Sequence, residues 1–175
     1  TIPDSVRTIA ENGIYGCLNV TSLTIGSGLE YLDSNNLFDF DALQTITVSQ
    51  ENQHFSTDES GVMFDKEKTV LVKAPTALAD GYQIPETVTE IGRRAFSGCS
   101  KLTAITIPES VQVIGDSAFD SCTSLKTVTI PDSLVSLGSY AFYGCEALES
   151  ISLENIRVID NAALWYCSSL IDVTF

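Results

Sequence analysis

Residues 84–106 read IPETVTEIGRRAFSGCSKLTAIT, and residues 107–129 read IPESVQVIGDSAFDSCTSLKTVT. The second segment repeats the landmarks of the first after 23 residues: an Ile-Pro pair, an Ile-Gly pair, an Ala-Phe pair, a Cys and a Leu. A third copy occupies residues 130–152. A fixed period of this length is typical of a solenoid, in which each repeat forms one coil and buries its apolar face against the next coil.

The same landmarks extend over the rest of the chain. They predict one solenoid over residues 1–175, with repeats at about 2–24, 25–47, 84–106, 107–129, 130–152 and 153–175 and one elaborated coil at 48–83. The second repeat has Gly26 where others carry Pro, and the last repeat is one residue short before Ile156. Because the chain opens inside a repeat, we expect it to be a segment of a longer protein.

The elaborated coil contains a predicted β-hairpin. Two short β-prone runs, 62–64 and 69–72, flank the charged residues 65–68. Such runs around a polar turn are typical of antiparallel strands. Since the segment starts and ends in phase with the repeat, we interpret it as part of the solenoid and not as a linker.

One half of each repeat predicts a β-strand. Ile105 and Ile107 alternate with Ala104 and Thr106, as in a strand with one buried face. Stacked coils would then form a parallel sheet whose outer face carries hydroxyls. This face is the predicted partner-binding surface, although Thr is also simply favourable in a solvated strand. Its candidate contact residues are Thr24, Thr47, Thr106, Thr127, Thr129, Ser150, Ser152 and Asp172.

The other half spaces its apolar residues as in a short helix. Ile91, Ala95, Phe96 and Cys99 follow the i, i+4, i+5, i+8 pattern of about two helical turns. Gly98, one residue before the Cys, favours a turn or a tight helix end. The Phe at this position of successive repeats should stack along the axis of the solenoid.

Cysteine occupies a single position of the repeat. The second repeat has Phe40 in place of Cys at this position, so the position is apolar and faces inward. Neighbouring coils lie about 4.8 Å apart, which is wider than the spacing of Cβ atoms in a disulfide. We therefore expect a ladder of reduced, buried thiols, which leaves the redox compartment open. The ladder comprises Cys17, Cys99, Cys122, Cys145 and Cys167.

Charge and composition argue against several classes of function. Asp and Glu number 23 against 9 Lys and Arg, so the net charge of −14 disfavours nucleic acid and anionic membranes as partners. No apolar run is long enough to insert this segment into a membrane. The single histidine, His54, offers no catalytic constellation, and we expect no enzyme, cofactor or metal site. The acidic pairs Asp39 with Asp41 and Asp58 with Glu59 lack the spacing of a calcium loop.

Aromatic residues recur directly after the Phe position of the repeat. Tyr15, Phe38, Tyr143 and Trp165 share this position, and Tyr140 and Tyr166 lie nearby. The residues Tyr140, Tyr143, Trp165 and Tyr166 form a candidate aromatic contact patch. The alternative is that these rings pack on neighbouring loops or on a next coil.

These residues resemble the BspA-like, or Treponema-type, leucine-rich repeats. The 23-residue unit of that family reads roughly I-P-x-S-V-x-x-I-G-x-x-A-F-x-x-C-x-x-L-x-x-I-x, and residues 107–129 match every landmark. The elaborated coil also resembles an interruption found in that family, with Asn52, Phe55, the run 61–66, Leu71 and Pro75, although Ser60 stands where the family usually has Asp.

The resemblance implies an α/β repeat solenoid. This would be a right-handed leucine-rich-repeat array with a parallel β-sheet on its concave side, short helices or turns on its convex side and one inserted hairpin. It further implies an extracellular or cell-surface bacterial protein whose signal and anchor lie outside this segment. Its function would be adhesin-like and non-enzymatic: binding a host extracellular-matrix or cell-surface protein, or a glycan. The alternative is a passive stalk that displays other domains.

Overall fold

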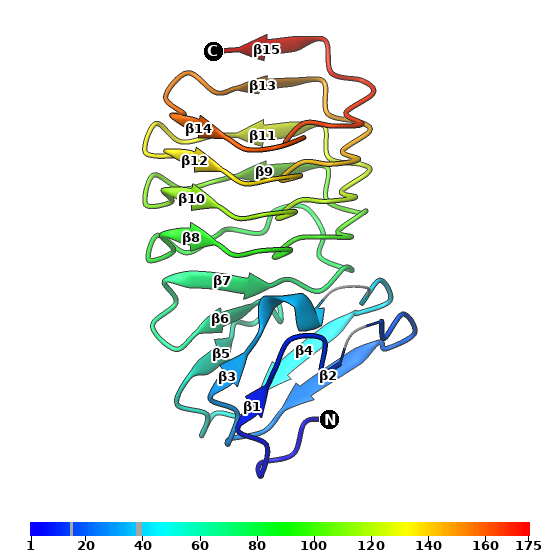
Figure 1. The fold of residues 1–175 in the computed structure, drawn as a ribbon, viewed down its shortest axis with the longest axis vertical. Coiled ribbons are helices and arrows are strands. Elements are labelled where there is room, and N and C mark those ends of the chain that lie inside the picture. The colour runs from blue at the N-terminus through cyan, green and yellow to red at the C-terminus, as the bar shows by residue number, and fades with distance from the viewer. Residues whose placement is uncertain (15, 38–39) are drawn as a thin grey trace.

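The structure is a computed structural model that describes residues 1–14, 16–37 and 40–175. The chain winds into coils that stack in sequence order along the long axis of the molecule, with the two termini at opposite ends (Figure 1). The chain is thus a β-solenoid, as the repeat predicts. Tyr15, Phe38 and Asp39, which the sequence analysis singled out, lie outside the described residues.

One side of the solenoid carries the predicted parallel strands. β9 (Ala104–Thr106), β11 (Thr127–Thr129), β13 (Ser150–Ser152) and β15 (Asp172–Thr174) form a four-stranded sheet in the order β15-β13-β11-β9. Nearer the N-terminus, β2 (Ser22–Ile25) pairs in parallel with β4 (Thr45–Val48). The register joins residues 23 positions apart, such as Thr127 and Ala104, so each coil places the same side chain over its neighbour.

The opposite side carries a second sheet that the sequence pattern did not predict. Its parallel strands are β8 (Glu90–Ile91), β10 (Val113–Ile114), β12 (Ser136–Leu137) and β14 (Val158–Ile159). A separate pair, β1 (Thr8–Ile9) and β3 (Tyr31–Leu32), lies in the first two coils. Strands of two residues leave too short an alternation to be recognised in a sequence.

Of the short helices or turns predicted for the far side of each repeat, the structure has turns, so the helices are wrong and so is the α/β class. The helix of the described residues is a single 3-10 turn, η1 (Ser34–Leu37). In residues 92–99 the backbone N–H groups instead alternate between two kinds of partner. The N–H groups of 95, 97 and 99 bond three residues back, while those of 94, 96 and 98 bond carbonyls of the next coil, at 2.7–3.2 Å. Consecutive turns therefore replace the helix.

Backbone conformation explains why no helix forms there. Arg94 and Gly98 have φ angles of 58° and 78°, in the left-handed region that interrupts an α-helix. Ser117 and Ser121 repeat the two positions with φ of 54° and 59°. The glycine was visible in the sequence, but the Arg and the two serines gave no such signal.

The hairpin is present and lies inside the solenoid. β5 (Phe55–Thr57), β6 (Met63–Asp65) and β7 (Val70–Lys73) pair antiparallel, and β7 then pairs in parallel with β8, which gives a seven-stranded sheet. Met63 packs into the apolar cluster of the first coils, and its neighbour Phe64 packs into that of the later coils. The hairpin thus separates two hydrophobic cores and contributes to both.

Phenylalanine rings form the axis of the larger core. Phe96, Phe119 and Phe142 are fully buried, and the centroids of successive rings lie 4.9 Å apart with interplanar angles of 4° and 5°. This distance is close to the spacing of the coils, so the backbone ladder sets the stacking of the rings. The stack is the one that the repeat predicts.

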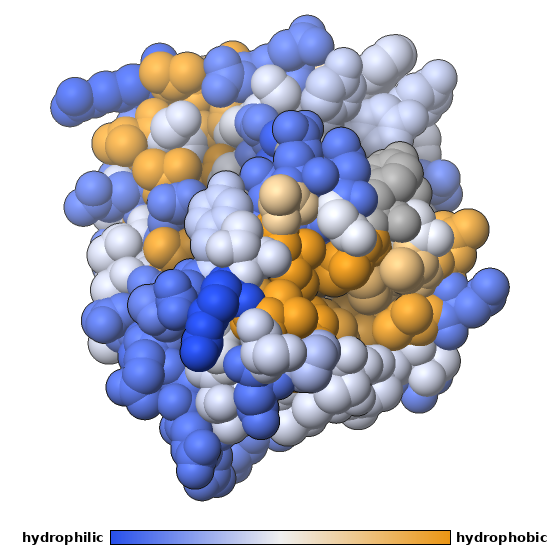
Figure 2. Space-filling view, turned by 60° about the horizontal axis from the view of Figure 1, so that its bottom comes forward, coloured by the Kyte–Doolittle hydropathy of each residue, from blue (hydrophilic) through white to orange (hydrophobic). Residues whose placement is uncertain are grey.

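The N-terminal end of the solenoid is apolar and hollowed, as Figure 2 shows from that end. The hollow has a volume of about 360 Å³, and its lining includes Ile2, Val6, Ile9 and Ile14. Among the described residues no helix is long and apolar enough to cross a membrane.

Candidate functional site

The hydroxyl face lies where the strand pattern places it. In β9, β11 and β13 the central residue is buried and the two flanking residues are exposed. All eight candidate contact residues are exposed, but the structure divides them between two sheets. Thr24 and Thr47 lie on β2 and β4, whereas the other six lie on β11, β13, β15 and β9. The face is therefore two separate rows of short side chains and not one continuous ladder.

A carboxylate closes the free edge of the four-stranded sheet. Asp80 accepts hydrogen bonds from the Thr103 hydroxyl (2.6 Å) and from the backbone N–H groups of Thr103 (2.7 Å) and Ala104 (3.3 Å). These bonds hold the pKa of Asp80 below its usual value. Because an unpaired edge strand is a template for another chain, Asp80 blocks strand addition at β9.

The structure brings all four residues of the candidate aromatic patch together. The ring centroids of Tyr143 lie 5.9 Å from those of Tyr140 and Trp165 and 5.5 Å from that of Tyr166, each in an edge-to-face arrangement. Trp165 stacks on Tyr166 at 5.1 Å. Trp165 and Tyr166 nevertheless remain 53% and 59% exposed. The rings therefore pack on one another and still present a large apolar surface to solvent.

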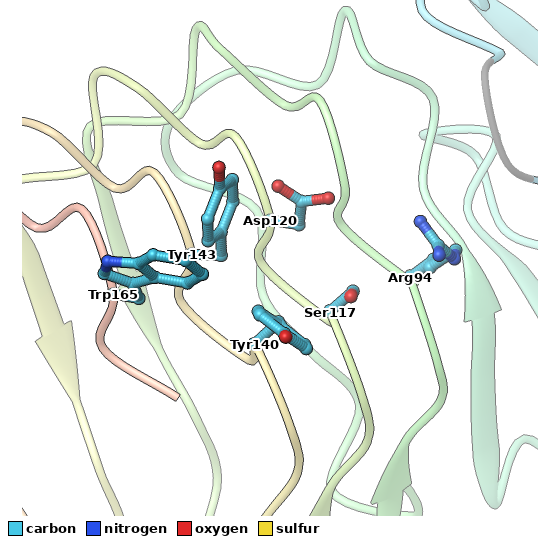
Figure 3. A pocket seen from close by; sticks show the side chains of 6 residues that line it. All are labelled: Arg94, Ser117, Asp120, Tyr140, Tyr143 and Trp165. Atoms are coloured by element: carbon cyan, nitrogen blue, oxygen red, sulfur yellow. The ribbon is translucent and has the colours of Figure 1, made fainter. Parts of the chain in front are cut away.

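Beside these rings lies a pocket of about 280 Å³. Figure 3 shows it running from Trp165 at one end to Arg94 at the other, with Tyr143, Tyr140, Asp120 and Ser117 between them. All of these residues lie in the turns that replaced the predicted helices. A hollow with aromatic walls and a few convergent polar groups is the usual form of a small-ligand site.

The polar groups of the pocket are unusual for their burial. Ser117 is only 8% exposed, and it lines the pocket. Asp120 is half-buried, and one of its oxygens accepts a hydrogen bond from the Ser121 hydroxyl at 2.8 Å. Burial raises the pKa of Asp120, while the Ser121 bond and the charges of Arg94 and Lys73 act in the opposite direction. The pocket thus carries one charge of each sign and the side chain of Ser117.

A second hollow adjoins the first across Tyr143. It has a volume of about 530 Å³, and Tyr143, Tyr166, Ser121, Glu146 and Ser168 are among its lining residues. Tyr143 is common to both hollows, so its ring forms a wall between them. The sequence analysis found the rings through their repeat position, but it missed the polar groups because Ser117 and Asp120 belong to a neighbouring coil.

A buried lysine supports the turn behind the pocket, and the sequence analysis missed it. Lys73 is 2% exposed, and its Nζ donates hydrogen bonds to the carbonyl oxygens of Arg94 and Ser97, each at 3.0 Å. Burial lowers the pKa of Lys73. The signal that could have found it is the alternation along β7, which places Lys73 on the same inward face as Leu71. Lys73 fixes the backbone of Arg94, one of the pocket residues.

All five cysteines are free thiols; Cys17 packs on the cluster of the first coils and the other four on that of the later coils. Cys99, Cys122 and Cys145 are buried, whereas Cys17 and Cys167, in the first and last coils, are only half-buried. The Sγ atoms of Cys122, Cys145 and Cys167 each lie 3.2 Å from the carbonyl oxygen of the Phe in the preceding coil. The thiols therefore donate weak hydrogen bonds between coils. Burial raises the pKa of Cys99 to about 11 and that of Cys167 to about 12.

These raised values predict a loss of stability in alkali. Cys99 stays protonated in the folded chain but ionises above pH 9 in the unfolded chain, so its contribution is complete below pH 9 and is lost as the pH rises to about 11. The shift corresponds to about 3 kcal/mol. Urea unfolding at pH 8.5 and pH 11 measures the loss, and the Cys99→Ala chain should lose less over the same interval. Equal losses in the two chains would contradict a buried, protonated Cys99.

The histidine and the acidic residues singled out in the sequence analysis are either exposed or close a turn. His54 is exposed in the loop before β5. Asp58 accepts hydrogen bonds from the N–H groups of Ser60 and Val62 and from the Tyr82 hydroxyl, so it closes a turn. Asp41 and Glu59 are exposed. In the part of the chain that the structure describes, no three His, Cys, Asp or Glu residues are grouped to hold a metal ion.

The stacked coils, the Phe axis and the one-position Cys ladder define a leucine-rich-repeat solenoid. The sequence pattern of the BspA type leucine-rich repeat region matches residues 1–60 and 78–175, in 6 copies. The chain therefore belongs to the BspA-type leucine-rich-repeat family. No curated protein matches the sequence significantly.

Several solved bacterial structures share the fold. The pneumococcal vaccine antigen PcpA is 23% identical with a TM-score of 0.90, over 98% of this chain and 49% of that one. A leucine-rich cell surface protein from Faecalibacterium prausnitzii is 26% identical with a TM-score of 0.87, over 99% of this chain and 52% of that one. A leucine-rich repeat protein from Bacteroides ovatus is 30% identical with a TM-score of 0.60, over 97% and 41%. The chain spans about half the length of the first two.

Proposed function

We propose that this chain is a non-enzymatic binding module of an extracellular or cell-surface bacterial protein, and that it contacts proteins of a host or of neighbouring cells. The observation that carries the proposal is the aromatic patch of Tyr140, Tyr143, Trp165 and Tyr166, which keeps Trp165 and Tyr166 more than half exposed. Tyr and Trp are enriched among the residues that dominate binding energy in protein interfaces. The patch is a stronger contact surface than the rows of Thr and Ser.

The setting of the patch supports binding over catalysis. Among the described residues that line the pocket, Asp120 is the one carboxylate, whereas glycoside hydrolysis, for example, needs a pair. Burial raises the pKa of the Cys99 and Cys122 thiols, which suppresses the nucleophilic thiolate. The membership of the family and the printed description of the Faecalibacterium prausnitzii relative as a cell surface protein support the proposed location.

Binding to an array of host matrix proteins and glycans tests the proposal. Three proteins are compared: the parent chain, a Tyr143→Ala/Trp165→Ala variant that removes half of the patch, and a Thr106→Arg/Thr129→Arg variant that places charge on the hydroxyl face. We expect the aromatic variant to lose about tenfold or more in affinity for a protein on the array, and the Arg variant to retain it. Circular dichroism checks that both variants are folded.

The other outcomes identify the alternatives. Loss of binding in the Arg variant alone would move the contact surface to the hydroxyl face. Binding to no protein, by any of the three chains, would contradict the proposal and favour a passive stalk that displays other domains.

A further inference from the structure

The two hollows on either side of Tyr143 have features that a general protein-contact patch does not need. The first is lined by Tyr140, Tyr143 and Trp165 together with Ser117 and the half-buried Asp120 carboxylate. A protein interface requires an exposed apolar surface, but not a set of buried polar groups gathered behind it. These groups indicate a ligand that enters the hollow and forms hydrogen bonds there.

The size of the first hollow limits the ligand. Its volume is about 280 Å³, at the lower end of the range of small-ligand pockets. This is room for one ring-sized group. The neighbouring hollow of about 530 Å³ is lined mainly by hydroxyls and one carboxylate, from Ser121, Thr123, Tyr166, Ser168 and Glu146. Two adjoining hollows with a shared aromatic wall suit a ligand made of linked rings.

Charge narrows the chemical class. Asp120 and Arg94 place one negative and one positive group in the first hollow, so neither a simple cation nor a simple anion meets a uniformly favourable field. A neutral ring with several hydroxyls can instead donate to the carboxylate and exchange hydrogen bonds with Ser117. Its apolar C–H face can lie on an aromatic ring, which buries apolar area from both partners.

We infer that the hollows on either side of Tyr143 form two adjoining subsites for a neutral oligosaccharide. This inference goes beyond the proposed function, because it assigns a second class of ligand, a sugar, to part of the same surface. One sugar ring lies in the hollow lined by Trp165, Tyr140, Asp120 and Ser117. The next ring lies beyond Tyr143, against Tyr166 and Ser121.

Trp165 reports on this site directly, since the chain contains a single Trp. The test titrates the parent chain with N-acetylglucosamine, its linear dimer and tetramer, and with galactose, glucose and their disaccharides, while tryptophan emission is recorded. We expect a saturable change in emission with a dissociation constant on the order of millimolar for single sugars, since an open pocket forms few contacts. Affinity for at least one disaccharide should exceed that of its monomer by about tenfold.

Variants separate the subsites from non-specific effects. Asp120→Asn keeps the shape of the pocket and should weaken the single sugar and the disaccharide alike, by about tenfold. Tyr143→Ala removes the shared wall and should abolish the advantage of the disaccharide. Tyr31→Ala is the matched control, because Tyr31 is 53% exposed, like Trp165, but lies on β3 in the second coil. It should leave every affinity unchanged.

Three results would overturn the inference. The first is that tryptophan emission does not change with any of the sugars, even at concentrations about 20-fold above the millimolar dissociation constant expected for single sugars. The second is a response to choline chloride or to a free amino acid in place of the sugars, which would assign a charged ligand. The third is binding that survives both Asp120→Asn and Tyr143→Ala. If a protein of the array still binds through the patch, only the inference about sugars fails, and the proposed function stands.

Discussion

Replacing Phe119 by Ala lowers the free energy of unfolding by about 3–5 kcal/mol, a large part of the roughly 5–15 kcal/mol that holds a typical domain folded. Phe119 is fully buried, with a ring on each side at 4.9 Å. Its removal leaves a cavity between two coils, and each neighbouring ring loses contact on one face. Because a coil is stabilised mainly by its neighbours, the loss affects both adjacent coils.

Urea unfolding followed by circular dichroism measures this effect. The matched control is Phe175→Ala, the same substitution at a side chain that is 78% exposed, and it should change the free energy by no more than about 0.5 kcal/mol. Hydrogen exchange should also rise most in the coils that contain Phe96 and Phe142. A Phe119→Ala chain as stable as the Phe175→Ala chain would mean that the ring stack is not part of the core.

The second large effect is expected at Gly138, where the backbones of two coils approach most closely within the regular repeats. A Cβ atom at this position would lie 2.6 Å from the backbone N of Asp116 and 2.7 Å from the backbone C of Gly115. Neither atom can move away without separating the coils. The same substitution would crowd the Asp116 carboxylate, whose oxygen accepts a hydrogen bond from the Ser139 N–H at 2.9 Å.

We therefore expect Gly138→Ala to destabilise the chain by about 2–3 kcal/mol. Gly81→Ala provides the comparison. Gly81 has a φ of 87° with nothing within 4 Å of a new Cβ, so this change measures backbone strain alone. Unfolding in urea should rank Gly138→Ala as the more harmful of the two. The reverse order would show that the coils tolerate a side chain at their closest approach.

The buried half of the repeat was predictable because every coil repeats the same sequence pattern. The strand residues, the Phe axis and the position of the thiols all follow from landmarks that recur after 23 residues. The turns were not predictable in the same way. Ile91, Ala95 and Cys99 have the spacing of a helix, yet the N–H groups of Arg94, Phe96 and Gly98 bond carbonyls of the next coil. Only the left-handed φ of Arg94 and Gly98 explains why. Ile91 itself lies in a strand, β8.

The candidate site was predictable only in part for a related reason. Tyr143 and Trp165 share a repeat position, and Tyr140 and Tyr166 lie near it, so the sequence placed the four rings on one side of the molecule. Asp120 and Ser117 reach them from a different coil, and Lys73 supports the turn of Arg94 from the hairpin. Contacts of this kind depend on how neighbouring coils are aligned, which local sequence patterns do not contain.

The central claim is that the aromatic patch is the surface through which this chain binds a partner. Hydroxyl-radical footprinting of the chain, alone and bound to a protein captured from the array, tests it most directly. The account predicts that the oxidation of Trp165 and Tyr166 falls several-fold in the complex, while that of Tyr31, which is as exposed as Trp165, stays the same. Unchanged oxidation of Trp165 and Tyr166 in a formed complex would contradict it.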